Sequence, residues 1–464
     1  MAIWIPELTG REGPKYLQIV EAMAEDIVAG RLPAGTRLPP HRELAYQLGL
    51  SPNTTSRAYA EAVKRALLKG EVGRGTFVRS TDRDPPQAEP ETLRRVEHGP
   101  IDLSRNLPMP GFSEPHIRSV MSGIAGDADL RSLLDYQTDA DLVHHREAGQ
   151  RWLAGCGVET DLDCVIPVIG GQHGILSSLM ALLQPGDLLL AEALTYTPVL
   201  AMAARLNLQT GAVAMDADGV VPEAFETWCK KAHPKAFYLT PTLQAPTTIT
   251  LSTARRTKIA SIANRYGVLL IEDDVFGPLK RDKPAPIASS APDTTVYVTS
   301  LSKTVAQGLR VGFLSAPRRL VSALHHSVNL SVWMTPPMTL EVARRMIENG
   351  TASKLIEHQQ RTATQRQQLA QQSLGADAIS QIADGFHIWL QLPDGWRADV
   401  FRAECARLGV RVSEGRGFAM NARDAPEAIR ICVSHEANEA RLKRGLDIVS
   451  GVLHQKPSGA SMVI

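Results

Sequence analysis

The chain has 464 residues, of which 44% are hydrophobic and 21% charged, and its formal net charge is +1. This length exceeds what one compact core supports, so we expect at least two domains. The apolar runs are far shorter than the roughly 18 residues of a membrane-spanning helix, and the amino terminus lacks the pattern of a signal peptide. The sequence therefore predicts a cytoplasmic protein with no membrane partner.

Positive charge is concentrated near the amino terminus. Residues 31–79 carry nine Lys or Arg against three acids, whereas residues 81–464 carry 39 basic and 41 acidic residues. A phosphate-backbone partner requires such a positive end, although a basic surface alone is more often merely solvated. The five cysteines form no Cys-x-x-Cys pair, so we expect neither a disulfide framework nor a metal site, and we interpret them as buried small side chains.

Residues 1–80 have the pattern of a winged helix-turn-helix. Apolar periodicity and stop signals predict three helices, at Lys15–Gly30, His41–Leu48 and about Pro52–Leu68. Gly49 is placed to end the second helix, and Ser51 is placed to cap the third. Residues 69–79 then contain two strand-like pieces around a glycine turn, which predicts a wing.

This order of elements resembles the GntR group of bacterial regulators over nearly all of residues 15–79. In such modules the start of the recognition helix enters the major groove, and the wing adds contacts beside it. The resemblance implies double-stranded operator DNA as a partner, contacted by Arg42, Ser51, Asn53, Thr54, Arg57, Arg74 and Gly75. Pro52 stands where the group often has an arginine, so a base contact normally made there is lost or moved. The alternative is a small helical domain with an ordinary solvated face.

Residues 81–100 are rich in proline and charge and lack apolar periodicity, so we interpret them as an exposed linker. Residues 456–464 are expected to form a flexible tail. If the family resemblance holds, the linker lets the DNA-binding domain lie over a partner subunit, in a domain-swapped, head-to-tail homodimer.

Residues 101–455 alternate apolar runs with helical stretches, which predicts an α/β fold with a mostly parallel sheet. The predicted strands are Val165–Ile169, Leu188–Ala191, Ala236–Leu239, Val268–Ile271 and Val296–Val298. Ligands gather at the carboxyl ends of strands in such sheets. Each group of candidate residues in this domain follows one of these runs.

Lys303 is the central candidate residue. Ser300 and Ser302 precede it closely, Arg310 lies seven residues after it, and Asp273 lies thirty residues before it. This spacing is typical of a pyridoxal phosphate anchor. A lysine amine forms the Schiff base, hydroxyls and a guanidinium donate to the phosphate, and a carboxylate pairs with the protonated ring nitrogen.

The constellation resembles the fold-type I aminotransferases over roughly residues 101–455. The resemblance implies pyridoxal 5'-phosphate as cofactor, bound by Lys303, Asp273, Ser300, Ser302, Arg310, Gly171, Gln172, Tyr196 and Tyr136. Gly171 and Gln172 would bind phosphate at a helix start, and Tyr196 would stack on the ring, although either feature alone is weak. Tyr136 matches a tyrosine that reaches the phosphate of the neighbouring subunit.

The same resemblance supplies an effector side. Arg430 matches the arginine that clamps a substrate carboxylate, and Asn106 lies where the family's amino-terminal segment lines the substrate. Two motifs depart from the family. Ala245 stands where an Asn normally holds the ring's phenolic oxygen, and the residues after Asp273 are Val275 and Phe276 instead of including a Tyr. None of these three side chains donates a hydrogen bond, so we predict a poorer electron-tuning site than in an efficient transaminase.

The two halves together resemble the MocR-type subgroup of the GntR family, and the segments 4–6 and 101–108 are similar to taurine and ectoine catabolism regulators. This implies a transcriptional regulator in which a small amino-acid-like effector forms an external aldimine with the cofactor and changes operator binding, without physiological turnover. Two alternatives stay open: a genuine aminotransferase with a DNA-binding appendage, and a cofactor-free dimerisation scaffold. The effector, the operator and the sign of regulation are not specified by these residues.

Overall fold

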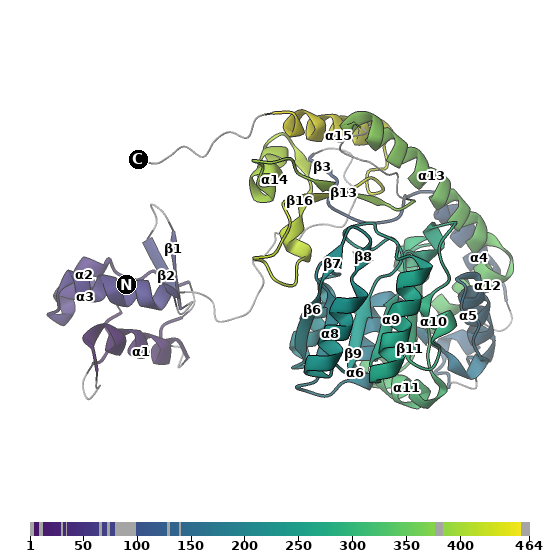
Figure 1. Cartoon of the computed structure of the whole chain (residues 1–464), viewed down its shortest axis with the longest axis horizontal. Helices are drawn as coiled ribbons and strands as arrows, with labels where there is room; N and C mark the ends of the chain where they lie inside the picture. The colour runs from purple at the N-terminus through teal and green to yellow at the C-terminus, as the bar shows by residue number, and fades with distance from the viewer. Residues whose placement is uncertain are drawn as a thin grey trace. The chain divides into compact units, whose positions relative to one another are not determined.

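The computed structural model describes residues 4–8, 13–28, 31–33, 35–64, 67–71, 75–78, 99–127, 130–138, 141–375 and 384–455. The chain divides into two compact units, residues 1–94 and residues 95–464 (Figure 1). Within the described residues, none of the helices has both the length and the hydropathy needed to cross a bilayer. The predicted linker residues 81–98 and the predicted tail, residues 456–464, lie outside the described residues.

The amino-terminal unit contains three helices followed by a two-stranded antiparallel sheet, as predicted. Its elements are α1 Lys15–Val28, α2 His41–Leu48, α3 Pro52–Lys64, β1 Leu68–Glu71 and β2 Gly75–Val78. Gly49 ends α2 in the left-handed conformation, and the Ser51 hydroxyl accepts a hydrogen bond from the Thr54 N–H at 3.2 Å. The predicted end of the third helix is wrong, because Leu68 pairs with Val78 in the strands and is buried in the core with it.

Side-chain hydrogen bonds join α3 to the segment before it. The Thr55 hydroxyl donates to the His41 carbonyl at 2.7 Å, and the Tyr59 hydroxyl donates to the Pro39 carbonyl at 2.8 Å. Thr55 and Tyr59 lie on the buried side of α3, whereas Asn53 and Arg57 are exposed. These two hydrogen bonds therefore hold the buried face of α3, the helix expected to contact DNA, while the face with Asn53 and Arg57 is exposed.

The carboxyl-terminal unit is built on a seven-stranded sheet in the order β4-β12-β11-β10-β9-β5-β6. The strands in this unit are β3 Ile101–Asp102, β4 Val165–Val168, β5 Leu188–Glu192, β6 Gln209–Val213, β7 Met215–Asp216, β8 Gly219–Val220, β9 Ala236–Leu239, β10 Leu269–Asp273, β11 Thr295–Ser300, β12 Gly312–Ser315, β13 His387–Gln391, β14 Val410–Arg411, β15 Ser413–Glu414 and β16 Ala428–Cys432. All five predicted strands belong to the large sheet. Its pairs are parallel except those of β12, which runs antiparallel to β11 and β4.

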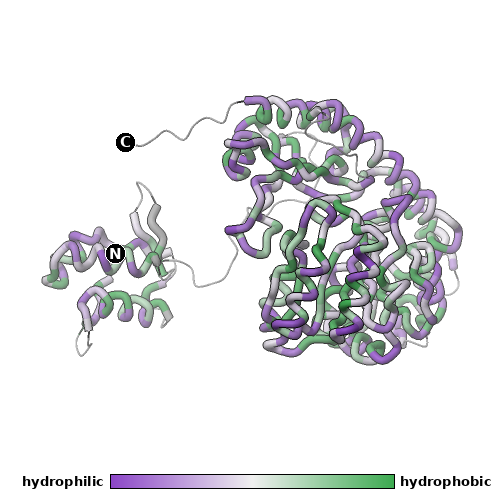
Figure 2. Tube along the Cα trace, viewed as in Figure 1, coloured by the Kyte–Doolittle hydropathy of each residue, from purple (hydrophilic) through white to green (hydrophobic). Residues whose placement is uncertain are grey.

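Helices lie on both sides of this sheet, and a smaller lobe stands at one end of it (Figure 1). The helices are α4 Ser113–Ala125, α5 Val143–Gly155, α6 Gly170–Leu182, α7 Pro198–Arg205, α8 Pro222–Ala232, α9 Thr253–Tyr266, α10 Ile287–Ser290, α11 Arg318–Val332, α12 Pro337–Glu348, α13 Thr351–Leu374, α14 Ala398–Arg407 and α15 Glu439–Leu453. Many of the outer helices alternate hydrophobic and hydrophilic segments, as expected when one face of each helix packs on the core (Figure 2).

The smaller lobe contains the three-stranded antiparallel sheet β13-β16-β15, with α13, α14 and α15 sharing its core. The strand β3, which opens the described part of this unit, pairs with β14 in the same lobe. The chain then leads from β3 to the large sheet. All five cysteines are free and buried, which confirms the prediction that they serve as small core side chains.

Candidate functional site

A cavity of about 240 Å³ lies where the large sheet meets the smaller lobe. Ten of the predicted site residues line it: Asn106, Gly171, Gln172, Tyr196, Asp273, Ser300, Ser302, Lys303, Arg310 and Arg430. Asp273 and Ser300 stand at the carboxyl ends of the parallel strands β10 and β11, the edge at which ligands bind in α/β sheets. Residues far apart in the sequence therefore surround one space.

One end of the cavity is suited to an anion. Gly170 and Gly171 begin α6, whose first N–H groups have no partners within the helix. A Cβ at Gly170 would come within 2.9 Å of the Arg310 guanidinium, and Gly170 also has a φ of 74°. A Cβ at Gly171 would come within 2.7 Å of the Val275 side chain. Glycine at these two positions leaves space at the start of α6 beside the Arg310 guanidinium. This space is suited to hold a phosphate.

The two serines at this end are oriented by the backbone. The Ser300 hydroxyl donates to the Val311 carbonyl at 3.0 Å, and it accepts from the Ser302 N–H at 3.1 Å. One N–H of Arg310 reaches the Ser302 hydroxyl at 3.4 Å. Arg310 itself has a φ of 52°, a conformation that costs free energy in a residue other than glycine and that turns its side chain toward α6.

Asp273 supplies a buried carboxyl group to the same cavity. The Tyr238 hydroxyl of β9 donates to it at 2.7 Å, and the Val275 N–H donates at 3.3 Å. Burial raises the pKa of Asp273 to about 6, although these hydrogen bonds oppose the rise. A cation placed against this carboxyl group would favour its charged form, because a buried carboxylate is costly unless it meets positive charge.

Lys303 also lines this cavity. Its Nζ donates to the backbone carbonyl of Asn106 at 2.7 Å and stands 5.1 Å from the centre of the Phe276 ring. Burial, and then the charge of Arg430, lower the pKa of Lys303 to about 8. About a tenth of this amine is therefore uncharged at pH 7, far more than for an ordinary lysine, and the uncharged form is the one that attacks a carbonyl.

Arg430 and Asn106 form the end of the cavity nearest the smaller lobe. Nη2 of Arg430 donates to the Ser104 carbonyl at 2.6 Å, and its guanidinium carbon lies 4.5 Å from the centre of the Phe418 ring. The Asn106 side-chain amide contacts Nδ1 of His387 at 3.0 Å. Among the described residues, Arg430 Nε and Asn106 Oδ1 are buried without a hydrogen-bond partner. This end can accept a polar ligand group such as a carboxylate.

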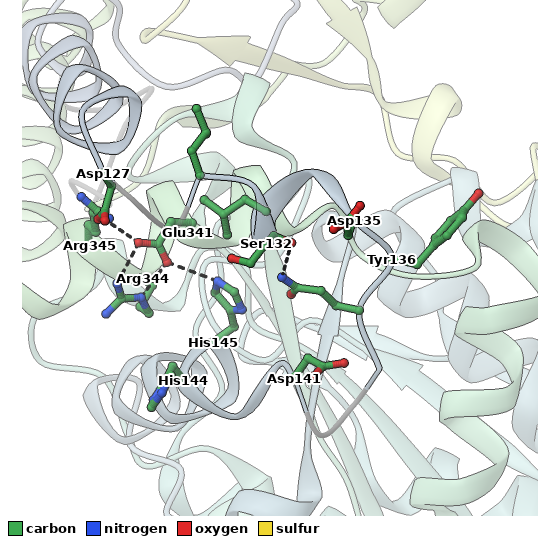
Figure 3. Close-up of a pocket in the computed structure, with 13 residues that line it drawn as sticks. Asp127, Ser132, Asp135, Tyr136, Asp141, His144, His145, Glu341, Arg344 and Arg345 are labelled. Carbon is green, nitrogen blue, oxygen red and sulfur yellow. Dashed lines mark hydrogen bonds and ion pairs between the residues drawn. The ribbon is translucent and has the colours of Figure 1, made fainter.

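Tyr136 does not line this cavity. It is 82% exposed and borders a separate cavity of about 630 Å³, where it points away from the cluster of Glu341, Arg344, Arg345 and His145 (Figure 3). Both arginines pair with the Glu341 carboxylate, which stands 3.3 Å from the buried His145 ring. The role of Tyr136 at a neighbouring subunit therefore stays a prediction.

On the amino-terminal unit, Arg42 and Asn53 are exposed near the starts of α2 and α3. The hydroxyls of Ser51 and Thr54 lie 2.8 Å apart and bond to each other. Arg57 is exposed but its guanidinium carbon lies 4.1 Å from the centre of the Tyr16 ring, which limits its reach. Gly75 is exposed and opens β2 with a φ of 118°, whereas Arg74 lies outside the described residues.

Three residues that the sequence did not single out belong with these sites. Tyr238 holds Asp273, His387 holds Asn106, and Tyr46 on α2 is 84% exposed beside the DNA-binding candidates. Tyr238 occurs in an apolar strand, where the sequence pattern indicates a core residue and not a residue of the site. A histidine at the start of a buried strand, such as His387, was the one available signal for a polar partner. Ala245, Val275 and Phe276, which replace the missing hydrogen-bond donors, line the cavity.

The fold and the cavity define a regulator-like architecture: a winged helix-turn-helix joined to a fold-type I aminotransferase-like domain. The structure of a kynurenine aminotransferase from Pyrococcus horikoshii, solved in complex with PMP, is similar, with a TM-score of 0.71 and 22% identity, covering 77% of this chain and 91% of that one. The regulator YdeF of Bacillus subtilis is 29% identical over 97% of this chain and 96% of its own length. The regulator TauR of Rhodobacter capsulatus is 25% identical over 92% and 94%.

Residues 121–448 match the family model Aminotransferase class I and II, and residues 15–78 match the model Bacterial regulatory proteins, gntR family. The chain belongs to the aminotransferase class I and II family, and the gntR domain in front of it makes it a MocR-type transcriptional regulator.

Proposed function

We propose that this protein is an operator-binding regulator that uses pyridoxal 5'-phosphate to sense a small amino compound. The observation that carries the proposal is the single cavity shared by a lysine, a buried carboxyl group, an anion cradle and a second arginine. Lys303, Asp273, Arg310 and Arg430 would each bind a different part of a cofactor and effector pair. Because the proposed partner is operator DNA of the kind bound by bacterial regulators, we expect the protein to act in the cytoplasm.

The residues present fit the cofactor. Ser300, Ser302, Arg310, Gly171 and Gln172 would hold its phosphate at the start of α6. Asp273 would pair with the ring nitrogen, Tyr196 would pack against the ring, and Lys303 would carry the cofactor covalently. When bound, the cofactor supplies a carbonyl carbon that exchanges one amine for another and an electron-withdrawing ring.

The effector would bind through both of its ends. Its amine would replace that of Lys303, and its carboxylate would bind Arg430, whose Nε is a free buried donor among the described residues. The displaced Lys303 amine, with its pKa near 8, can hold or release a proton beside the Asn106 carbonyl. Phe276 and Val275 offer no hydrogen bond to the ring oxygen, which favours sensing over fast turnover.

Operator affinity would change through a shift between two arrangements of the DNA-binding units. A coupling free energy of about 1–3 kcal/mol changes affinity about 5- to 150-fold. At the DNA, Arg42, Asn53 and Gly75 are exposed, and Ser51, Thr54, Arg57 and Arg74 complete the proposed contact set. The proposal includes a domain-swapped, head-to-tail homodimer, in which Tyr136 reaches the phosphate of the second subunit.

The test is an absorption titration of the full chain with pyridoxal phosphate, followed by β-alanine, taurine and 2,4-diaminobutyrate as probes. We expect a visible band that Lys303→Ala abolishes and that the control Lys258→Ala, at an exposed position of α9, retains. One probe should change the band and the affinity for operator DNA together. A wild-type chain that stays colourless refutes the sensor, and steady amine turnover at enzyme-like rates identifies an aminotransferase instead.

A further inference from the structure

A short segment after β3 contacts both cationic residues of the cavity through its backbone. We call residues 104–106 the strap. The Ser104 carbonyl accepts from Arg430 at 2.6 Å, and the Asn106 carbonyl accepts from Lys303 at 2.7 Å. These two carbonyls therefore help to fix the positions of Lys303 and Arg430, the residues proposed to meet the amine and the carboxylate of the effector.

The strap is anchored on both sides. Before it, β3 pairs with β14, and the Ser104 carbonyl also accepts from the Ser413 hydroxyl at 3.2 Å. After it, the side chain of Gln359 bonds to both the N–H and the carbonyl of Met109, each at 3.1 Å. Between these anchors, the Asn106 side chain reaches the His387 ring at 3.0 Å. A displacement of Asn106 would move the carbonyl that meets Lys303.

His387 is placed to hold Asn106. It is fully buried at the start of β13, the strand that pairs with the Arg430 strand β16. Burial, and then the charge of Arg430, lower the pKa of His387 to about 3, so the ring is neutral at ordinary pH. With the Asn106 N–H₂ group facing the ring, Nδ1 of His387 accepts, which assigns the ring proton to Nε2, an atom without a hydrogen-bond partner among the described residues.

We propose that His387 is a positioning residue of the sensor: it orients Asn106, and Asn106 fixes the strap carbonyls that hold Lys303 and Arg430. This inference rests on the proposed function where it is tested by the binding of cofactor and effector. The arrangement of the strap itself does not depend on that function. The Phe276 ring lies 6.1 Å from the His387 ring and beneath the Lys303 amine, so these groups form one continuous packed cluster.

A double-mutant cycle on the full chain tests the proposal. His387→Leu and Asn106→Ala should each weaken pyridoxal phosphate binding about five- to tenfold, the effect of one lost hydrogen bond. The double variant should bind no more weakly than either single variant, because both changes remove the same link. His387→Gln, which can still present an acceptor to Asn106, should restore most of the affinity.

A matched control separates positioning from damage to the strand. Gln367 donates to the backbone carbonyl of His387 at 2.9 Å, so Gln367→Leu disturbs β13 without removing the ring. We expect Gln367→Leu to lower the melting temperature, and its effect on cofactor affinity to add to that of Asn106→Ala. Additive effects of His387→Leu and Asn106→Ala, or a failure of His387→Gln to recover affinity, would overturn the proposal.

A second measurement needs no cofactor. Hydrogen exchange of the peptide covering residues 103–109 should become several-fold faster in His387→Leu, while exchange in α15 stays unchanged. If the wild-type chain does not bind pyridoxal phosphate, the proposed function fails and this exchange measurement alone decides the role of His387. Unchanged exchange in that peptide would then refute the link between His387 and the strap.

Discussion

Glu192, at the end of β5, provides a quantitative test of the electrostatics behind the cavity. It is fully buried, and its Oε2 accepts from the Thr240 N–H at 3.0 Å, the Thr240 hydroxyl at 2.7 Å and the Gln244 amide at 3.2 Å. Burial raises the pKa of Glu192 from 4.5 to about 7, against the effect of these hydrogen bonds. Its stabilising contribution is therefore complete below pH 4.5 and is lost as the pH rises through 7, a change of about 3 kcal/mol.

Glu192→Gln keeps an acceptor for the same donors and removes the charge. The unfolding free energy of the variant relative to wild type should rise by up to about 3 kcal/mol between pH 4.5 and pH 8. Urea unfolding followed by circular dichroism at several pH values measures this difference. Glu357→Gln, which makes the same chemical change on the exposed side of α13, serves as the matched control. Parallel stability profiles for wild type and Glu192→Gln would refute the argument from burial.

Three further outcomes are expected. Gly171→Ala should weaken pyridoxal phosphate binding at least about tenfold and lower stability by about 1–3 kcal/mol, because the added Cβ meets Val275 at 2.7 Å within the phosphate cradle; equilibrium titration of the folded variant checks this. Tyr238→Phe should raise the pKa of Asp273 further, so that the pH below which cofactor affinity declines moves upward in a titration series. Arg42→Ala should weaken operator binding and reduce the slope of log affinity against log salt by about one, and an unchanged slope would remove it from the interface.

The sequence was sufficient for the elements whose signal is local. The five predicted strands are fully or almost fully buried runs, and buried parallel strands read as continuous apolar stretches. Asp273 could be chosen because it ends such a run, where an apolar environment makes its charge costly. Lys303 could be chosen because of its spacing to Asp273 and Arg310, which is typical of a pyridoxal phosphate anchor. The helix start at Gly170 was detectable because two glycines follow the apolar run that forms β4, and one residue separates them from the end of that strand.

Contacts between distant segments could not be read in this way. The contact between Asn106 and His387 joins residues 281 positions apart, and nothing in either local pattern specifies the other. Tyr238 has the spacing of a core residue, and only the register of β9 beside β10 brings its hydroxyl to Asp273. The end of α3 was misplaced because Leu68 satisfies an apolar helical period as well as a strand that packs on the same core.

The residues that line the cavity come from distant parts of the chain, so they are synthesised at different times. The hydrogen bond between Arg430 and the Ser104 carbonyl joins residues 326 positions apart. The end of the cavity formed by Arg430 and Asn106 is therefore complete only when β16 has been synthesised. The amino-terminal unit has its own core and depends on contacts close in sequence, and such units generally fold first on the ribosome. Under the proposed function, a product that terminates before β16 would therefore retain the DNA-binding unit without the proposed effector site, and would compete with the intact regulator for the same promoters.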